Sequence, residues 1–232
     1  MACFFCLVFS LRYNEYSCEV TVRKSILIFF DTKMKTIIFD FDGVIHDTFD
    51  LAHKVKNEAT GKDSSKEEYR DFFNGNIFEA VAVDNEIEKN FLRLQKEAFK
   101  YLKLEKDIKQ HLENLSKNYF LCIISSNQED VLNMYFQNND FVHIFKEILG
   151  AETHRSKVEK FKYLFAKHAL KVEDCVFVTD TLGDILEGHK VGVKTIAVDF
   201  GFHESERLKK GKPFKIVSNF EEISLAINNL WK

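Results

Sequence analysis

The stretch TIIFDFDGVIHDT, residues 36–48, is the part of the chain that decides the fold. Its first four residues are apolar or β-branched, which is typical of a buried strand, and they are followed by Asp40, Asp42 and Gly43. Because side chains alternate along a strand, the two aspartates are expected to point in the same direction. Burying either carboxylate alone is costly, whereas Mg²⁺ prefers hard oxygen ligands such as carboxylates. The sequence therefore predicts a cation site at the end of this strand.

The overall composition is that of a globular protein. The 232 residues are 45% hydrophobic and 30% charged, with a formal net charge of -3 and a single Pro. This length is sufficient for one large domain or for a core with a modest insertion. The charge balance gives no reason to expect a nucleic-acid partner, and the aromatic content of 14% argues against disorder.

Residues 1–33 differ in character from the rest of the chain. The first eleven, MACFFCLVFSL, are too few to span a bilayer, and they lack the basic region and cleavage site of a secretory signal, so no membrane partner is expected. Residues 25–30 could form an extra edge strand. Met34 comes two residues before the core strand. We hypothesise that native translation starts at Met34, which would make residues 1–33 a dispensable N-terminal extension.

The cysteines indicate a reducing compartment. There are five, and Cys122 and Cys175 lie within apolar runs predicted to be buried strands, as core thiols do. Cys3 and Cys6 form a single CxxC without a second pair at zinc spacing, so chance is favoured over a metal site. We expect a cytoplasmic protein.

Residues 49–104 are predicted to be helical throughout. One helix is expected to begin at Asp50, another at Ser65, and a third to run from Ile87 to Leu104 with apolar residues at helical spacing. This segment contains the phenylalanines Phe72, Phe73 and Phe78. They would form either a substrate lid or, as we favour, a small hydrophobic core within the segment.

From Glu105 onwards, predicted strands and helices alternate. Strands are expected at residues 119–124, 147–149, 175–178 and 194–198, and helices around residues 108–115, 131–138, 156–170 and 183–192. This order implies a mostly parallel sheet covered by helices on both faces, with ligands at the carboxyl ends of the strands. The predicted fold class is α/β, a three-layer Rossmann-like parallel sheet with an inserted small α-helical domain.

Polar residues follow the predicted strands, and each has two interpretations. Ser125 and Ser126 follow the second strand, and Ser126 has capping-box spacing to Glu129. A helix cap and a phosphate-binding helix start fit these residues equally well, because free N–H groups at a helix start also bind phosphate.

Lys157 lies in the first turn of a predicted helix, after Ser156 and before Glu159, which have capping-box spacing. A cation at this position opposes the helix dipole, a cost that is offset if the lysine faces a phosphate and a carboxylate. A solvated surface lysine is the alternative interpretation.

Asp180 and Asp184 lie four residues apart where a strand meets a helix. Asp184 could be a helix-cap partner of Thr181, and Asp180 a turn residue. Asp180 lies at the end of a buried strand, however, and a carboxylate there needs a partner. Together with Asp40 and Asp42, Asp180 supplies oxygen ligands for one hard cation.

From about Lys35 to the C-terminus, these motifs together resemble the haloacid dehalogenase (HAD) superfamily. They are DFDGV at residues 40–44, Ser125 after an apolar strand, Lys157 at a helix start, and DTLGD at residues 180–184, in the order that the family has. The resemblance implies a HAD-like core with a helical cap inserted after the first motif. The domains expected are a core of residues 34–48 and 105–232 and a cap of residues 49–104.

The same resemblance implies a Mg²⁺-dependent phosphatase. Asp40 would be the nucleophile that forms an aspartyl-phosphate, and Asp42 would protonate the leaving alcohol and then deprotonate the attacking water. Mg²⁺ would be held by Asp40, the backbone carbonyl of Asp42, and Asp180. The remaining implied positions are the phosphate-binding Ser125, Ser126 and Lys157 and the supporting Asp184 and Gly43.

Three functions remain open within this resemblance. An acid at Asp42 suits phosphoryl transfer, whereas the superfamily's dehalogenases lack an acid there and its phosphonate hydrolases carry alanine. The DGVIHDT stretch resembles β-phosphoglucomutases, and residues 179–203 resemble phosphoglycolate-phosphatase-type proteins. We favour a phosphatase acting on a small phosphorylated metabolite over a phosphomutase or a catalytically silent binding protein. His46 and His203 are expected near the mouth of the site as lining residues.

Overall fold

The structure, a computed structural model, describes residues 35–80 and 84–231. The predictions for residues 1–33, for the start at Met34 and for Cys3 and Cys6 lie outside the described residues. The described residues fall within one compact unit, Lys33–Lys232. Among them, none of the helices is long and apolar enough to cross a membrane.

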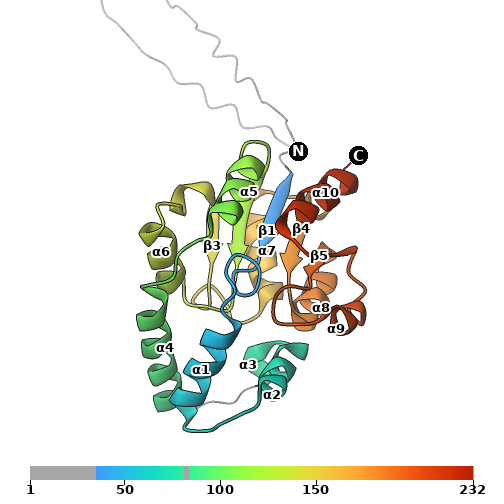
Figure 1. Cartoon of the computed structure of the whole chain (residues 1–232). Coiled ribbons are helices and arrows are strands. Elements are labelled where there is room, and N and C mark those ends of the chain that lie inside the picture. Colours follow the sequence, from blue (N-terminus) through green and yellow to red (C-terminus); the bar gives the residue numbers. More distant parts are fainter. Residues whose placement is uncertain (1–34, 81–83, 232) are drawn as a thin grey trace, which may run out of the picture. The chain divides into compact units, whose positions relative to one another are not determined.

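A six-stranded parallel sheet forms the centre of this unit, in the order β3-β2-β1-β4-β5-β6 (Figure 1). The strands are β1 Thr36–Phe39, β2 Phe120–Ile124, β3 Glu147–Leu149, β4 Cys175–Thr179, β5 Lys194–Val198 and β6 Lys215–Val217. The central strand, β1, pairs Ile38 with Cys122 of β2 on one side and with Phe177 of β4 on the other. Parallel neighbours need long crossover connections, and helices supply them here.

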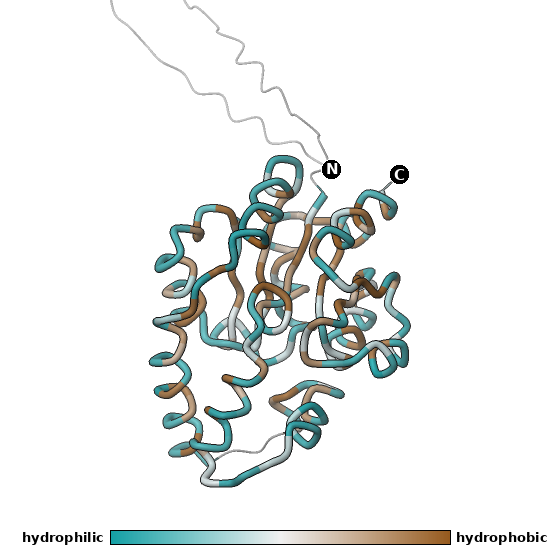
Figure 2. Tube along the Cα trace, in the orientation of Figure 1, coloured by the Kyte–Doolittle hydropathy of each residue, from teal (hydrophilic) through white to brown (hydrophobic). Residues whose placement is uncertain are grey.

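Helices cover both faces of the sheet. They are α5 Lys106–Ser116, α6 Glu129–Asn138, α7 Lys157–His168, α8 Leu182–Lys190, α9 Ser205–Lys209 and α10 Phe220–Leu230. Residues of α5, α6 and α10 share one apolar cluster with Ile37 and Phe39, while α7 packs with Ile38 on the opposite face. The strands are correspondingly the most hydrophobic part of the unit (Figure 2). The predicted three-layer α/β class is confirmed.

A second group of helices follows β1 and lies beyond the carboxyl ends of the strands (Figure 1). It consists of α1 Phe49–Thr60, α2 Lys66–Asp71, the 3-10 turn η1 Phe72–Asn74, α3 Ile77–Ala80 and α4 Asn85–Phe99. We call residues 49–104 the helical insertion. The predicted helix to Leu104 was wrong at its end, because α4 stops at Phe99 and the N–H of Leu104 donates to Asn139 Oδ1 at 2.9 Å.

Candidate active site

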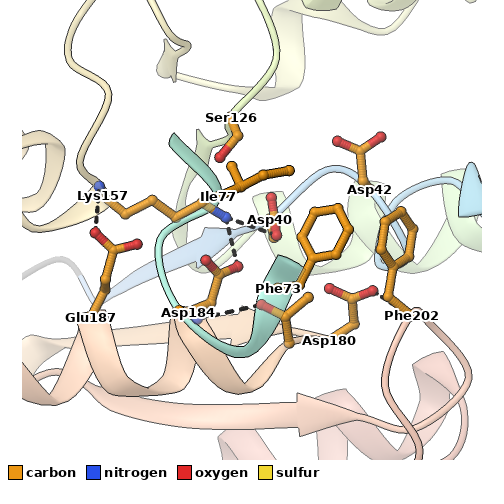
Figure 3. Close-up of a pocket in the computed structure, with 12 residues that line it drawn as sticks. Asp40, Asp42, Phe73, Ile77, Ser126, Lys157, Asp180, Asp184, Glu187 and Phe202 are labelled. Atoms are coloured by element: carbon orange, nitrogen blue, oxygen red, sulfur yellow. Dashed lines mark hydrogen bonds and ion pairs between the residues drawn. The ribbon is translucent and has the colours of Figure 1, made fainter. Parts of the chain in front are cut away.

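The two aspartates after β1 lie at one end of the sheet, Asp40 buried and Asp42 partly buried, and both line a small cavity of about 30 Å³ (Figure 3). The carboxylate of Asp40 accepts the backbone N–H of Phe41 at 2.7 Å. The carboxylate of Asp42 accepts the Thr48 hydroxyl at 2.6 Å and the Asn127 amide at 2.8 Å. The predicted common direction of the two side chains is therefore seen, while Phe41 packs into the core.

Burial sets the protonation of these two carboxyl groups. It raises the pKa of Asp40 well above its usual value, and the Lys157 ammonium only partly opposes this effect. Burial also raises the pKa of Asp42 to about 6, against the hydrogen bond from Thr48, which favours the charged form. Asp42 can therefore exist in both protonation states near neutral pH.

Lys157 joins two carboxylates from different elements, that of Asp40 after β1 and that of Asp184 in the first turn of α8. Its Nζ lies 2.8 Å from Asp40 Oδ2 and 2.6 Å from Asp184 Oδ2, and the residue is only 3% exposed. Burial alone would lower the pKa of this lysine, but the two carboxylates overcome that effect and raise it. The alternative of a solvated surface lysine is excluded by this geometry.

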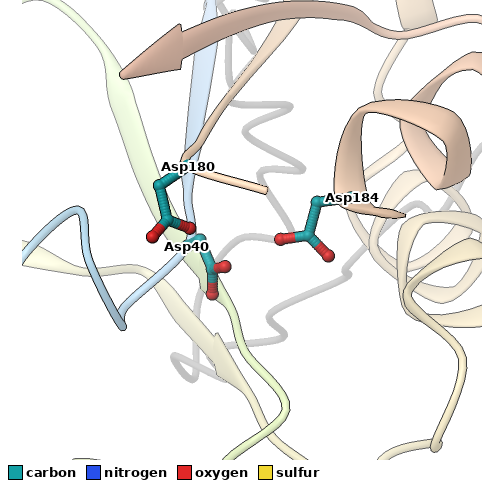
Figure 4. A group of neighbouring side chains, drawn as sticks. All are labelled: Asp40, Asp180 and Asp184. Atoms are coloured by element: carbon teal, nitrogen blue, oxygen red, sulfur yellow. The ribbon is translucent and has the colours of Figure 1, made fainter. Parts of the chain in front are cut away.

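Three carboxylates, those of Asp40, Asp180 and Asp184, place ligand atoms within 4.8 Å of one another (Figure 4). Asp184 also accepts the Thr179 hydroxyl at 2.7 Å, and Asp180 Oδ2 accepts the N–H of Phe202 at 2.7 Å. Asp180 Oδ1 is buried and has no hydrogen-bond partner among the described residues. Three buried acids facing one ammonium leave excess negative charge, so the donor set fits a hard divalent cation.

Two glycines leave the space that the Asp180 side chain occupies. Gly43 has a φ of +68°, which favours glycine, and a Cβ there or at Gly201 would collide with the Asp180 side chain. The assignment of Gly43 as a supporting residue thus acquires a steric basis.

The serines after β2 differ in position. Ser126 lines the small cavity, whereas Ser125 is fully buried and its Oγ accepts the N–H of Asn127 at 3.1 Å. The predicted capping box from Ser126 to Glu129 is wrong, because α6 begins at Glu129 with Gln128 at the cap position. The carboxylate of Glu129 instead accepts the N–H of Gly150 at 3.1 Å.

Glu187 of α8 is a site residue that the sequence did not reveal. Ser156 does precede α7, but its side chain caps no N–H of that helix. Glu187 Oε1 accepts the backbone N–H of Lys157 at 3.0 Å and the hydroxyl of Ser156 at 3.1 Å. A carboxylate from another helix therefore caps the helix start that carries Lys157.

The two histidines make structural hydrogen bonds. His46 Nδ1 lies 3.0 Å from the hydroxyl of Tyr135. His203 is fully buried, with Nδ1 accepting the N–H of Leu182 at 3.0 Å and Nε2 donating to the carbonyl of Arg70 at 2.9 Å. Neither residue lines either of the two cavities at this end of the sheet.

The phenylalanines of the insertion have mixed surroundings. Phe72 and Phe73 pack against a small cluster formed by Phe49, Tyr69 and Phe202. Phe72, Phe73 and Phe78 also line a second cavity beside the acidic one. Phe72 and Phe73 therefore both pack in a core and line the cavity, whereas Phe78 lines the cavity.

A family model described as haloacid dehalogenase-like hydrolase matches residues 37–198, which include all four motifs. The chain belongs to this family. It has the expected order of motifs on the expected fold, and we refer to it below as a haloacid dehalogenase-like hydrolase.

Similar proteins agree with this assignment. The phosphoglycolate phosphatase of Pasteurella multocida is 25% identical over 121 residues, which are 50% of this chain and 54% of that protein, so the chain spans about half the length of this relative. PpaX of Caldanaerobacter subterraneus, named only as a candidate pyrophosphatase, is 27% identical over 195 residues, covering 78% of this chain and 89% of that protein. The solved structure of a haloacid dehalogenase-like family hydrolase from Streptococcus pneumoniae has the same fold, with a TM-score of 0.70 at 22% identity over 84% of this chain and 99% of that chain. These relatives are named for phosphatase, pyrophosphatase or hydrolase activities, and the solved structure shares the fold.

Proposed function

We propose that this hydrolase removes phosphate from a small phosphorylated metabolite through an aspartyl-phosphate on Asp40. The observation that carries the proposal is the buried bridge of Lys157 between Asp40 and Asp184, beside the unpaired oxygen of Asp180. A cation held against the attacking carboxylate is suited to a phosphate dianion, whose charge must be balanced as it is transferred.

The residues support two successive displacements. Asp40 attacks phosphorus, the ester P–O bond breaks, and Asp42 gives its proton to the leaving oxygen. The Asp42 carboxylate then takes a proton from a water that attacks phosphorus, the bond to Asp40 breaks, and phosphate leaves. The pKa of about 6 suits Asp42 to both steps.

Mg²⁺ is part of the same proposal. Asp40, Asp180 and the backbone carbonyl of Asp42 would hold it, and when bound it would neutralise charge on the phosphoryl oxygens. Lys157 and Ser126 would bind the phosphoryl group, and Ser125 would shape the loop that carries Ser126. Asp184 would position Lys157 through its 2.6 Å ion pair.

The helical insertion, residues 49–104, is proposed to be a cap over a core of residues 34–48 and 105–232. Contacts between the two parts support this arrangement: Arg70 Nε donates to the carbonyl of Phe202 at 2.9 Å, and Gln95 Nε2 donates to Asn127 Oδ1 at 2.9 Å. A closed cap excludes water from the reacting groups. The free, buried thiols Cys122 and Cys175 suit a cytoplasmic enzyme.

The proposal predicts that Asp40→Asn abolishes Mg²⁺-dependent phosphate release from p-nitrophenyl phosphate, because the amide cannot attack phosphorus. The matched control is Asp50→Asn, which changes an exposed acid paired only with Lys66 and should leave the rate near that of the wild type. Persistent turnover by the folded Asp40→Asn protein would refute the nucleophile. Sugar-phosphate isomerisation without net phosphate release by the wild type would favour a mutase instead.

A further inference from the structure

The second cavity lies beside the acidic one and is much larger. Its volume is about 480 Å³, within the range of roughly 300–1,000 Å³ that holds small organic ligands. The two cavities share Asp42, Phe73, Ile77, Ser126 and Phe202. A phosphate held at Lys157 would therefore direct the rest of its molecule into the larger space.

Aromatic side chains form much of the wall of this larger cavity. They come from the helical insertion and from the loop before α9: Tyr69, Phe72, Phe73, Phe78, Phe91 and Phe202. Such rings favour planar apolar groups, which they contact by offset stacking or edge to face.

The cations of the wall are poorly placed to bind a second anionic group. Among the lining residues that the structure describes, they are Lys56 and Arg155. Lys56 Nζ donates to Ser64 Oγ at 2.7 Å and lies 5.3 Å from the centre of the Phe72 ring. The side chain of Arg155 is 62% exposed and pairs with Glu88 at 3.0 Å. A small acid such as 2-phosphoglycolate would place its carboxylate in this cavity where Arg155 is already paired and Lys56 is already held by a neutral hydroxyl.

Gln95 of α4 is a buried polar residue in this wall. It lines the larger cavity and is only 6% exposed. Its Nε2 is used by Asn127, but its Oε1 is buried and accepts no hydrogen bond within the described part of the chain. Buried acceptors are normally paired, and a turn of this side chain towards the cavity would let Oε1 accept an N–H or O–H group of a bound molecule.

We propose that the larger cavity binds the alcohol part of the substrate, and that this alcohol carries a planar, largely apolar ring whose N–H or O–H group donates to Gln95 Oε1. The inference rests on the phosphatase activity proposed above and adds its substrate class. Phosphomonoesters of such ring-bearing alcohols are then better substrates than 2-phosphoglycolate.

The first experiment compares kcat/KM with Mg²⁺ for 2-(indol-3-yl)ethyl phosphate, 2-(naphthalen-1-yl)ethyl phosphate and 2-phosphoglycolate. All three are esters of primary alcohols, so intrinsic reactivity differs little between them. Both ring esters should exceed 2-phosphoglycolate by ~10-fold or more, because only they fill the apolar cavity. Hydrolysis of 2-phosphoglycolate at an equal or higher rate would overturn the substrate class and leave the phosphatase intact. Absence of phosphate release from all three esters and from p-nitrophenyl phosphate would overturn the phosphatase itself.

The second experiment isolates Gln95. The indole carries an N–H that the naphthalene lacks, so the wild type should prefer the indolyl ester by about 10-fold. Gln95→Met should bring the ratio of the two esters close to one. Gln95→Met also removes the hydrogen bond to Asn127. That loss should change kcat/KM for both esters by the same factor, so it cancels in their ratio. The control Arg93→Ala, an exposed residue of the same helix, should keep the wild-type ratio.

A third variant tests the cavity by its volume. Ala52→Phe adds a ring to the wall and should lower kcat/KM for the two ring esters relative to 2-phosphoglycolate by ~10-fold. An unchanged relative rate in Ala52→Phe, or an unchanged indolyl preference in Gln95→Met, would show that the alcohol does not occupy this cavity as proposed.

Discussion

Lys160 lies in an environment that is unusual for a lysine, because it is buried without an ion pair among the described residues. It is completely buried, and its ammonium group donates to the backbone carbonyl of Ser125. Burial lowers the pKa of Lys160 to about 7, and the nearby ammonium of Lys157 contributes in the same direction. A buried amine with a lowered pKa makes the stability of the fold depend on pH.

Lys160→Met should therefore change this dependence. Between pH 7 and the usual lysine pKa near ~10.4, the unfolded chain holds a proton on this amine that the folded chain has lost. Stability of the wild type thus gains from rising pH in this window. Since the variant lacks that gain, its stability relative to the wild type should be highest at pH 7 or below and fall towards pH 10.

Urea denaturation at several pH values measures this difference. Lys162→Met is the matched control, because Lys162 is an exposed lysine of the same helix, paired with Glu159 at 2.7 Å. A difference between Lys160→Met and the wild type that stays constant from pH 6 to 10 would contradict the neutral buried amine.

At the scale of elements, the start of α7 depends on a neighbouring helix. The first N–H groups of an α-helix have no partner within the helix, and here Glu187 accepts that of Lys157. Glu187→Ala should cost about 1–2 kcal/mol of stability, as the loss of a helix cap does. It should also lower kcat, because the first residue of the loosened turn is Lys157.

Thermal denaturation and turnover of the same preparations check this prediction. Glu159→Ala is the control, since Glu159 lies in the same first turn but pairs only with the exposed Lys162. Equal effects of the two substitutions would show that Glu187 has no special role at this helix end.

Some elements were predicted from the sequence and others were missed. Apolar runs that end in polar residues predicted β1 to β5 because a buried parallel strand leaves that pattern. No helix or strand was predicted after residue 203, although Phe220, Ile223 and Ile227 of α10 recur at helical spacing. The strand β6, Lys215–Val217, was not predicted either, and like β3 it is only three residues long.

At the scale of the whole molecule, the acidic cluster links stability to metal and to pH. Burial raises the pKa of Asp40 and of Asp180, so the folded metal-free protein keeps protons that the unfolded chain releases. The stability from these protons is present at low pH and is lost as pH rises through the raised pKa values. Bound Mg²⁺ needs the charged carboxylates, so its stabilising effect should grow over the same pH range.

Mg²⁺ at ~100 times its dissociation constant should add about 2.7 kcal/mol, which raises the Tm of a chain of this length by roughly 5–10 °C. Asp180→Asn should remove most of this increase while leaving the metal-free protein at least as stable, because a buried carboxyl group that is costly to ionise is replaced by a neutral amide. Asp199→Asn, at the end of β5 outside the cluster, is the control.

Scanning calorimetry with Mg²⁺ and with EDTA measures the increase in Tm and the Tm of the metal-free protein. An equal Mg²⁺ response in wild type and Asp180→Asn would place the ion elsewhere.

The sequence located the site more completely than it located the partners of each side chain. Asp40, Lys157, Asp180 and Asp184 were predicted together, because each follows a strand or starts a helix at one edge of the sheet. The residues that bond Asp42, Lys157 and Asp184, or that bond such a partner in turn, were not predicted: Thr48, Gln95, Asn127, Thr179 and Glu187. Most of these contacts join distant segments, so they leave no local spacing, and both proposed capping boxes assumed local partners for the same reason.

The contact between Gln95 and Asn127 has a consequence for the order of events in one catalytic cycle. The amide of Asn127 reaches Asp42 with one end and Gln95 with the other, so a single side chain spans α4 and the carboxyl group after β1. If α4 swings away to admit an ester or release its product, that amide loses one of its two anchors and becomes free to rotate. Asp42, the proposed proton donor, would then be held in position only while the cap is closed, so proton transfer would be confined to the interval between substrate entry and product release.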